Sequence, residues 1–138
     1  MCANLRRASR ALTQQYEEIL RPLGLRATQF TILQALSKAG EVSQSTLGRI
    51  LAMDTTTLTR TLEIMRRHGW VAERRGDDRR ERLLRLAKNG RKQLQRALPA
   101  WEKVQGEVQR QLGDDTWHAL LNLTYKVASL VPEKGELS

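Results

Sequence analysis

Arginine is concentrated in one stretch of this 138-residue chain, and its side chain is well suited to binding phosphate. Between Arg60 and Arg96 the sequence has thirteen Arg or Lys against five Asp or Glu, which accounts for nearly all of the net charge of +9. Of the 24 basic residues, 18 are Arg, whose planar guanidinium forms paired hydrogen bonds with phosphates and base edges. The pattern predicts a polyanionic partner, with nucleic acid first and an anionic membrane surface second.

The arginine-rich stretch is predicted to form a β-hairpin. Residues 70–75 and 82–86 alternate in polarity, and Gly76-Asp77-Asp78 supplies the turn. A membrane-surface protein would carry its basic residues along an amphipathic helix, so the hairpin favours DNA. A guanidinium at the tip can enter the narrow minor groove, and we expect Asp78 to hold a neighbouring arginine in a bidentate pair. The candidate DNA contacts of the hairpin are Arg74, Arg75, Arg79, Arg80 and Arg82.

Four threonines lie at the start of a helix predicted for residues 55–67. Threonine is a mediocre helix former, so this concentration needs a reason. Its hydroxyl can bond phosphates and bases, and its methyl can meet the thymine methyl. Redundant capping is the alternative, since Asp54 or Thr55 must cap this helix. The candidate contacts are Thr55, Thr56, Thr57, Thr59 and, one turn further on, Arg60.

A short helix is predicted just before the threonine-rich one, joined to it by Ala52-Met53-Asp54. Ser43 is placed to cap it. The amides and side chains at its start, from Ser43, Gln44 and Ser45, suit phosphate binding. Two helices with a tight link, followed by a cationic hairpin, form a module that places one helix in a DNA groove and a loop beside it.

The remaining elements are predicted to be helical. Apolar residues recur at three- and four-residue steps over 4–21 and 87–112. Thr28 is placed to cap a helix that Gly40 ends, and Asp114 to cap the last helix. The predicted fold is mainly α with a small two-stranded wing, in the order α-α-α-α-β-β-α-α. The inward face predicted for the last helix is Trp117, Leu120, Leu121, Thr124, Ala128 and Val131.

The length fits a single domain, residues 1–138, in which a DNA-binding unit at 28–86 lies between long helices at 4–24 and 87–131. A 26-residue helix spans about 39 Å, longer than the small unit that it follows. We expect these helices to bury their apolar stripes against a second copy, a single-chain bundle being the alternative. A two-fold dimer also suits DNA, because a palindromic site needs two readers one turn apart.

These residues resemble the MarR family of winged-helix regulators over nearly the whole chain, from about Leu5 to Val131. The motifs that carry the resemblance are Leu23-Gly24-Leu25, Thr28-Gln29-Phe30, Thr55-Thr56-Thr57-Leu58-Thr59-Arg60, Gly69-Trp70 and Asp78-Arg79-Arg80. The resemblance implies a homodimer held by the N- and C-terminal helices. It also implies a recognition helix at 55–67 in the major groove and Arg79 or Arg80 in the minor groove.

Ala87 departs from the family pattern, in which a threonine caps the long helix. Alanine there should cost about 1 kcal/mol, so we expect a frayed or displaced helix start. The N-terminus also resembles the organic-peroxide-sensing OhrR branch, in which a cysteine matching Cys2 is oxidised and a tyrosine matching Tyr16 bonds to it. The branch's other tyrosines correspond to Arg6 and Ala27, so the set is incomplete. Redox sensing and an inert thiol are both open for Cys2.

Tyr16, Phe30 and Trp101 are candidates for a pocket that binds a small aromatic, phenolic-type effector, with ordinary core packing as the alternative. The predicted function is that of a homodimeric repressor of transcription, released from a palindromic double-stranded DNA operator by such a ligand or by thiol oxidation. A low-specificity architectural DNA-binding protein is the rival.

Several function classes are disfavoured by the sequence. His68 and His118 lie in separate elements without partners at ligand spacing, and no phosphate-binding glycine loop or nucleophile elbow is present, so we expect neither an enzyme nor a metal or other cofactor. The one cysteine excludes a disulfide within the chain. No apolar run approaches membrane-spanning length and no signal peptide is visible, so we expect no membrane partner and a cytoplasmic location.

Overall fold

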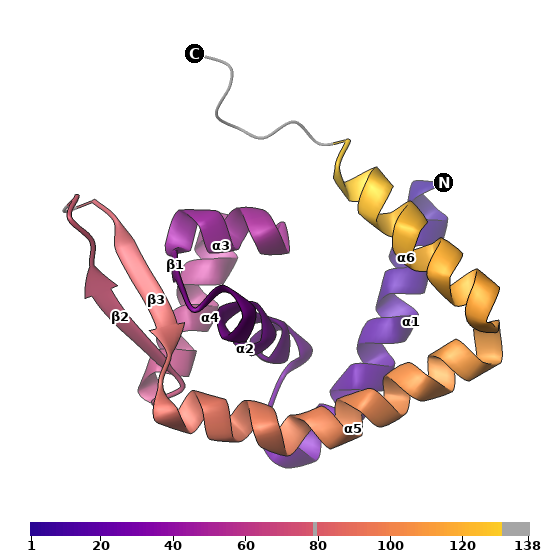
Figure 1. Ribbon diagram of the computed structural model, residues 1–138, viewed down its shortest axis with the longest axis horizontal. Helices are drawn as coiled ribbons and strands as arrows, with labels where there is room; N and C mark the ends of the chain where they lie inside the picture. Colours follow the sequence, from indigo (N-terminus) through magenta and orange to yellow (C-terminus); the bar gives the residue numbers. More distant parts are fainter. Residues whose placement is uncertain (79, 131–138) are drawn as a thin grey trace. The chain divides into compact units, whose positions relative to one another are not determined.

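Six helices and three short strands make up the part of the chain that the computed structural model describes, residues 1–78 and 80–130 (Figure 1). The elements are α1 (Cys2–Leu20), the 3-10 turn η1 (Arg21–Leu23), α2 (Ala27–Ala39), β1 (Glu41–Ser43), α3 (Gln44–Leu51), α4 (Thr55–Arg67), β2 (Val71–Arg75), β3 (Arg82–Leu86), α5 (Lys88–Leu112) and α6 (Asp114–Ala128). The chain divides into two compact units, Met1–Trp101 and Glu102–Ser138. Arg79 and Val131, named above, lie outside the described residues.

The wing belongs to a three-stranded antiparallel sheet in the order β1-β3-β2. The two strands predicted for the hairpin are confirmed. The prediction missed a third strand, because β1 pairs with the other edge of β3. Gly40, with a φ of 78°, turns the chain from α2 into β1. At three residues, β1 is too short to show an alternating pattern, and it supports a hairpin that would be marginal alone.

The core of the first unit lies between the sheet and helices α2, α3 and α4. The inward face of α4 is formed by Leu58, Leu62 and Met65, each at most 2% exposed. Trp70, Leu84 and Leu86 of the hairpin join this core. Figure 1 shows β2 and β3 projecting past the helices, so the tip of the wing lies beyond this apolar support.

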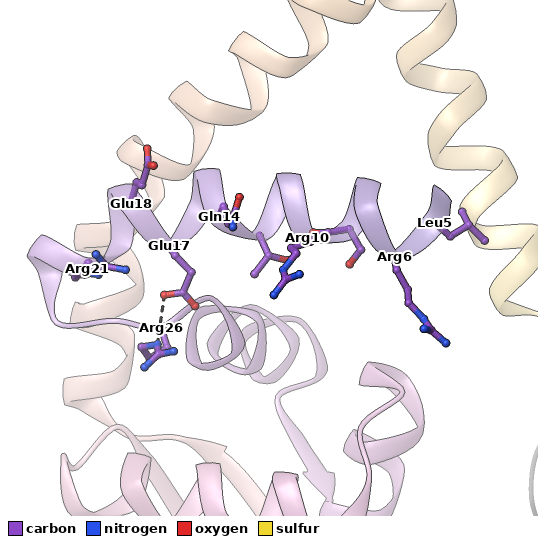
Figure 2. Close-up of a pocket in the computed structure, with 10 residues that line it drawn as sticks. Leu5, Arg6, Arg10, Gln14, Glu17, Glu18, Arg21 and Arg26 are labelled. Carbon is purple, nitrogen blue, oxygen red and sulfur yellow. Dashed lines mark hydrogen bonds and ion pairs between the residues drawn. The ribbon is translucent and has the colours of Figure 1, made fainter. Parts of the chain in front are cut away.

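Helix α2 begins two residues before a cap at Thr28 would place it, so the prediction for Thr28 is wrong. Its N-cap is Arg26, whose N–H donates to Gln29 Oε1 at 3.0 Å. The next amide, of Ala27, donates to Glu17 Oε1 of α1 at 2.9 Å, and Glu17 Oε2 lies 3.3 Å from Arg26 Nε (Figure 2). The carboxylate of Glu17, on another helix, therefore accepts from a free amide at the start of α2, a role expected of a local hydroxyl.

Helix α5 begins at Lys88, and the loose start expected from Ala87 is not found. The Ala87 N–H donates to Trp70 O at 3.0 Å, and the Arg91 N–H donates to Ala87 O at 3.0 Å. A Cβ on Gly90 would lie 2.0 Å from the same Trp70 carbonyl oxygen. Backbone contact with the wing thus fixes this helix start, and only glycine permits the approach.

Helix α6 follows Gly113, which holds the N-cap position, so Asp114 is not the cap that was predicted. Asp114 instead accepts from Gln109 Nε2 at 3.1 Å. No residue of α6 is buried, although its predicted inward face was apolar, and Tyr125 is 76% exposed. The expected burial of this helix is therefore not found among the described residues.

The two short helices of the DNA-binding unit have the caps that local sequence predicts. Ser43 Oγ accepts from the Thr46 N–H at 3.1 Å and caps α3. Asp54 caps α4, since its Oδ1 accepts from the Thr57 N–H at 2.8 Å and its Oδ2 from Thr57 Oγ1 at 2.7 Å. These hydrogen bonds hold the pKa of the Asp54 carboxyl below its ordinary value of 3.8.

The first prediction concerns Gly90. Gly90→Ala should lower the free energy of unfolding by about 1–3 kcal/mol, because the new methyl collides with backbone that cannot move away freely. The matched control is Gly106→Ala in the same helix, where a Cβ meets nothing within 4 Å and alanine should add about 1 kcal/mol. Urea denaturation followed by circular dichroism measures both. Equal stabilisation by the two variants would contradict the close approach.

The second prediction concerns the cap of α4. Because the folded pKa of Asp54 is lowered, its stabilising effect is fully present above 3.8 and is lost as the pH falls through the folded value. Asp54→Ala should lower the urea midpoint at neutral pH, and this difference from wild type should vanish in acid. Asp54→Asn, a neutral residue that also caps well, should keep most of the midpoint at every pH. A difference between Ala and wild type that is independent of pH would rule out the charged cap.

Candidate nucleic-acid interface

Helices α3 and α4 pack closely at a tight link. A Cβ on Gly48 of α3 would lie 3.3 Å from Leu58 Cδ2 of α4, and Ala52 turns the chain with a φ of 51°. Across the pair, Gln44 Nε2 donates to Thr59 Oγ1 at 3.0 Å. Two predicted DNA contacts, one from each helix, are thus joined on the same outer surface.

The N-terminal half of α4 presents its predicted contacts to solvent. Thr55, Thr56, Thr59 and Arg60 are exposed. Thr57 is exposed as well, but its hydroxyl donates to the Asp54 cap, so its methyl is the part left to meet a base. Among the threonines predicted as contacts, Thr57 is therefore also part of the helix cap. Ser45, at the start of α3, is exposed too.

The C-terminal end of α4 is basic, but its two arginines form ion pairs with glutamates. Arg67 Nη2 lies 2.9 Å from Glu63 Oε1 on the next turn of the helix. Arg66 pairs with Glu73 of β2. These two arginines are thereby less available to a phosphate than Arg60.

On the outer face of the sheet, Arg74 is clamped by Glu41. Its Nε and Nη2 lie 2.9 and 2.5 Å from the two carboxylate oxygens of Glu41, which bridges β2 to β1 across β3. The hydrogen bonds from Arg74 lower the pKa of Glu41, and the same contact raises the pKa of Arg74. Arg74, predicted from sequence as a DNA contact, is placed here as a link between strands.

The turn of the wing is organised by backbone hydrogen bonds. The Gly76 N–H donates to Glu81 O and the Glu81 N–H to Asp78 O, each at 2.9 Å. Asp78 Oδ1 accepts from the Arg80 N–H at 3.1 Å, so its carboxylate bonds to backbone instead of forming the expected bidentate pair with a described arginine. The predicted contact Arg79 is not described.

Three predicted contacts are left with free guanidinium groups. Within residues 1–78 and 80–130, no hydrogen bond or ion pair engages the side chains of Arg60, Arg75 or Arg80. Arg82 is different, because its Nε lies 3.5 Å from Glu73 Oε1. Among the predicted contacts that the structure describes, one free guanidinium thus lies on α4 and two lie at the wing.

Sequence reasoning missed the acidic partners Glu41 and Glu73. The strand pattern could have indicated that Glu73 faces the core, because it lies two residues from Val71, which is buried, and must share a strand face with it. No local signal marks Glu41, which lies 33 residues from Arg74 and meets it only through the sheet.

Cys2 and Tyr16 do not meet within one chain. Cys2 is exposed at the first residue of α1, and Tyr16 lies fourteen residues later in the same helix, about 21 Å along its axis. Tyr16 is half-buried, and burial raises the pKa of its hydroxyl. A bond between these two side chains therefore requires two subunits.

The proposed effector residues lie at the core of the first unit. Phe30 is 3% exposed and its ring centroid lies 5.8 Å from that of Trp101, while Tyr16 packs against the same core. A separate open groove of about 1090 Å³ runs along α1, lined by Arg6, Arg10 and Arg21 among others, and includes none of the three aromatic residues (Figure 2).

None of the helices in the described ranges combines the length and the apolarity that crossing a membrane requires. Those residues also include no group of three or more His, Cys, Asp or Glu side chains able to hold a metal ion.

Comparisons with known proteins agree with this layout. A sequence model of the MarR family matches residues 23–81. The transcriptional regulator MosR of M. tuberculosis, solved in complex with DNA, is 37% identical, with 96% of this chain and 98% of that chain covered and a TM-score of 0.81. Two Bacillus subtilis proteins are each 28% identical. They are the uncharacterised HTH-type transcriptional regulator YwoH (86% of this chain, 87% of that protein) and an organic hydroperoxide resistance transcriptional regulator (83% and 78%).

The family match covers the α2–wing region, and the similarity to MosR extends over almost the whole chain. The chain therefore belongs to the MarR family of winged-helix transcriptional regulators.

Proposed function

We propose that this regulator binds a palindromic DNA operator sequence-specifically, with α4 in the major groove and the wing in the adjacent minor groove. The observation that carries the proposal is the free guanidinium of Arg60 beside exposed threonines on α4, together with those of Arg75 and Arg80 on the wing. Arginine and threonine are suited to reading base edges, and a tip arginine to a narrow minor groove. The complex of MosR with DNA supports this proposal.

We further propose a homodimer in which the N- and C-terminal helices form the shared layer. The support is the apolar surface of α6, where Leu121, Leu123 and Tyr125 are 49%, 59% and 76% exposed. Apolar area of this kind is normally buried against another surface. Two-fold symmetry would set the recognition helices about 34 Å apart, one turn of DNA.

The architectural alternative is disfavoured, because such a protein binds through backbone and deformability and does not need a solvent-facing row of threonines. A regulator should prefer its operator over random DNA by about 10³-fold or more. We place its action in the cytoplasm, the compartment that holds the chromosome in the bacteria from which the relatives come.

Repression relieved by a signal completes the proposal. A small aromatic effector near Tyr16, Phe30 and Trp101, or oxidation of Cys2, would change the spacing of the two recognition helices, a coupling typically worth about 1–3 kcal/mol. The similarity to an organic hydroperoxide resistance regulator favours the thiol.

The third prediction tests DNA binding with two arginines. Duplexes selected from a random pool give the preferred site, and fluorescence anisotropy gives affinities at several salt concentrations. Arg60→Ala should weaken the binding free energy for the preferred duplex by about 1–3 kcal/mol and relax the sequence preference at one base position. Arg80→Ala should weaken binding to all sequences and reduce the salt slope by about 1.

The matched control is Arg110→Ala, which removes the same charge from α5, where Arg110 pairs with Glu107. It should change neither the preferred site nor the salt slope. If wild type selects no sequence, or if the two test variants bind like this control, the proposed function is wrong.

The fourth prediction tests the thiol. Cumene hydroperoxide should release wild-type protein from its selected duplex, and Cys2→Ser should abolish this release because it removes the chain's one cysteine. Tyr16→Phe should slow the release if the partner subunit's tyrosine supports the thiol. Undiminished release in Cys2→Ser would discard thiol sensing and leave the aromatic effector.

A further inference from the structure

Glu73 joins the recognition helix to the wing. It lies in the middle of β2, with its side chain only 18% exposed. Its two carboxylate oxygens have different partners. Oε2 bonds to Arg66 in the last turn of α4, and Oε1 lies 3.5 Å from Arg82 Nε at the start of β3. One acidic side chain thus binds arginines from two elements that the proposed function assigns to different grooves.

The register of the sheet explains this position. Glu73 is paired with Leu84, which is 0% exposed, so Glu73 is on the core-facing side of β2. Arg82 shares that face, two residues along β3, at the diagonal distance that long side chains can span. Beyond Glu73, the pairs Arg74 with Leu83 and Arg75 with Arg82 complete the ladder. Glu73 is therefore the last inner-face anchor before the tip.

The charge of Glu73 is unfavourable for DNA binding taken alone. A carboxylate beside the interface repels phosphate and also occupies two arginines that would otherwise be free to bind it. A side chain that only contributed charge would lower affinity for every sequence equally. Glu73 can favour DNA binding only through the positions of the elements that it joins. Contacts from two elements add to the affinity only when both elements reach their bases and phosphates on the same duplex at once.

We propose that Glu73 is a positioning residue that sets the wing relative to the recognition helix and thereby determines sequence discrimination. This inference rests on the proposed function. By tying Arg66 and Arg82 together, Glu73 limits non-specific phosphate binding by both, and it keeps the free arginines of the wing tip where the operator needs them.

The fifth prediction compares Glu73→Gln with Glu63→Gln. Both remove one negative charge, but Glu63 pairs only within α4, with Arg67. Affinities are measured for the duplex that wild type selects and for a scrambled duplex of equal composition. Glu73→Gln should bind the scrambled duplex more tightly and the selected duplex less tightly. The ratio of the affinity for the selected duplex to that for the scrambled duplex should fall about tenfold, the effect of one misplaced contact. Glu63→Gln should raise both affinities together and leave the ratio unchanged.

Glu73→Asp provides a second variant that keeps the charge and shortens the side chain by one methylene. It should lower the ratio without raising affinity for the scrambled duplex. A merely electrostatic role predicts no change in this variant, and a merely structural role predicts that both affinities fall together.

A measurement without DNA separates this inference from the proposed function. Spin labels at Ile64→Cys on α4 and Asp77→Cys at the wing, in a Cys2→Ser background diluted with unlabelled protein, report the distance between the two elements by double electron–electron resonance. Glu73→Gln should broaden that distance distribution, and Glu63→Gln should not. Absence of selection by wild type would overturn the proposed function and with it the role of Glu73 in discrimination, and the distance distribution would then test the positioning by Glu73 separately. An unchanged affinity ratio or an unchanged distance distribution in Glu73→Gln would overturn the role of Glu73.

Discussion

The arrangement of the whole wing depends on the burial of Leu84 in the central strand. Leu84 pairs with Val42 on one side and with Glu73 on the other, and it is fully buried. A slip of β3 by one residue would bring Leu83 into the core and turn Arg82 and Arg85 to the opposite face. Burial of one leucine therefore decides that Arg74 meets Glu41 on the outer face and that Arg82 meets Glu73 on the inner one.

The basic charge of the chain is consequently sorted by its acidic residues. Glu41, Glu63 and Glu73 form ion pairs with four arginines of α4 and the wing, which are Arg66, Arg67, Arg74 and Arg82. Among the described residues, Arg60, Arg75 and Arg80 take part in none of these ion pairs. Net charge explains attraction to a polyanion, but the positions of the acidic residues explain which arginines are available to bind it.

Sequence reasoning succeeded where the signal was local and failed where it was tertiary. Ser43 and Asp54 cap the helices that their spacing indicated. The cap of α2 was missed because Glu17 reaches it from another helix. Strand β1 was missed because three residues carry no periodicity. No residue of α6 is buried, although its apolar stripe predicted an inward face.

Stability and DNA recognition rest on different interactions in this molecule. The apolar side chains of the core, such as Leu33, Leu47 and Leu62, are removed from water and supply the folding free energy. Exposed ion pairs add little to it, because water and salt compete with both partners. The ion pairs of the wing therefore contribute less to folding than the apolar core does. Since they decide where the arginines lie, a winged helix with an unchanged core can acquire a new sequence preference by exchanging these partners alone.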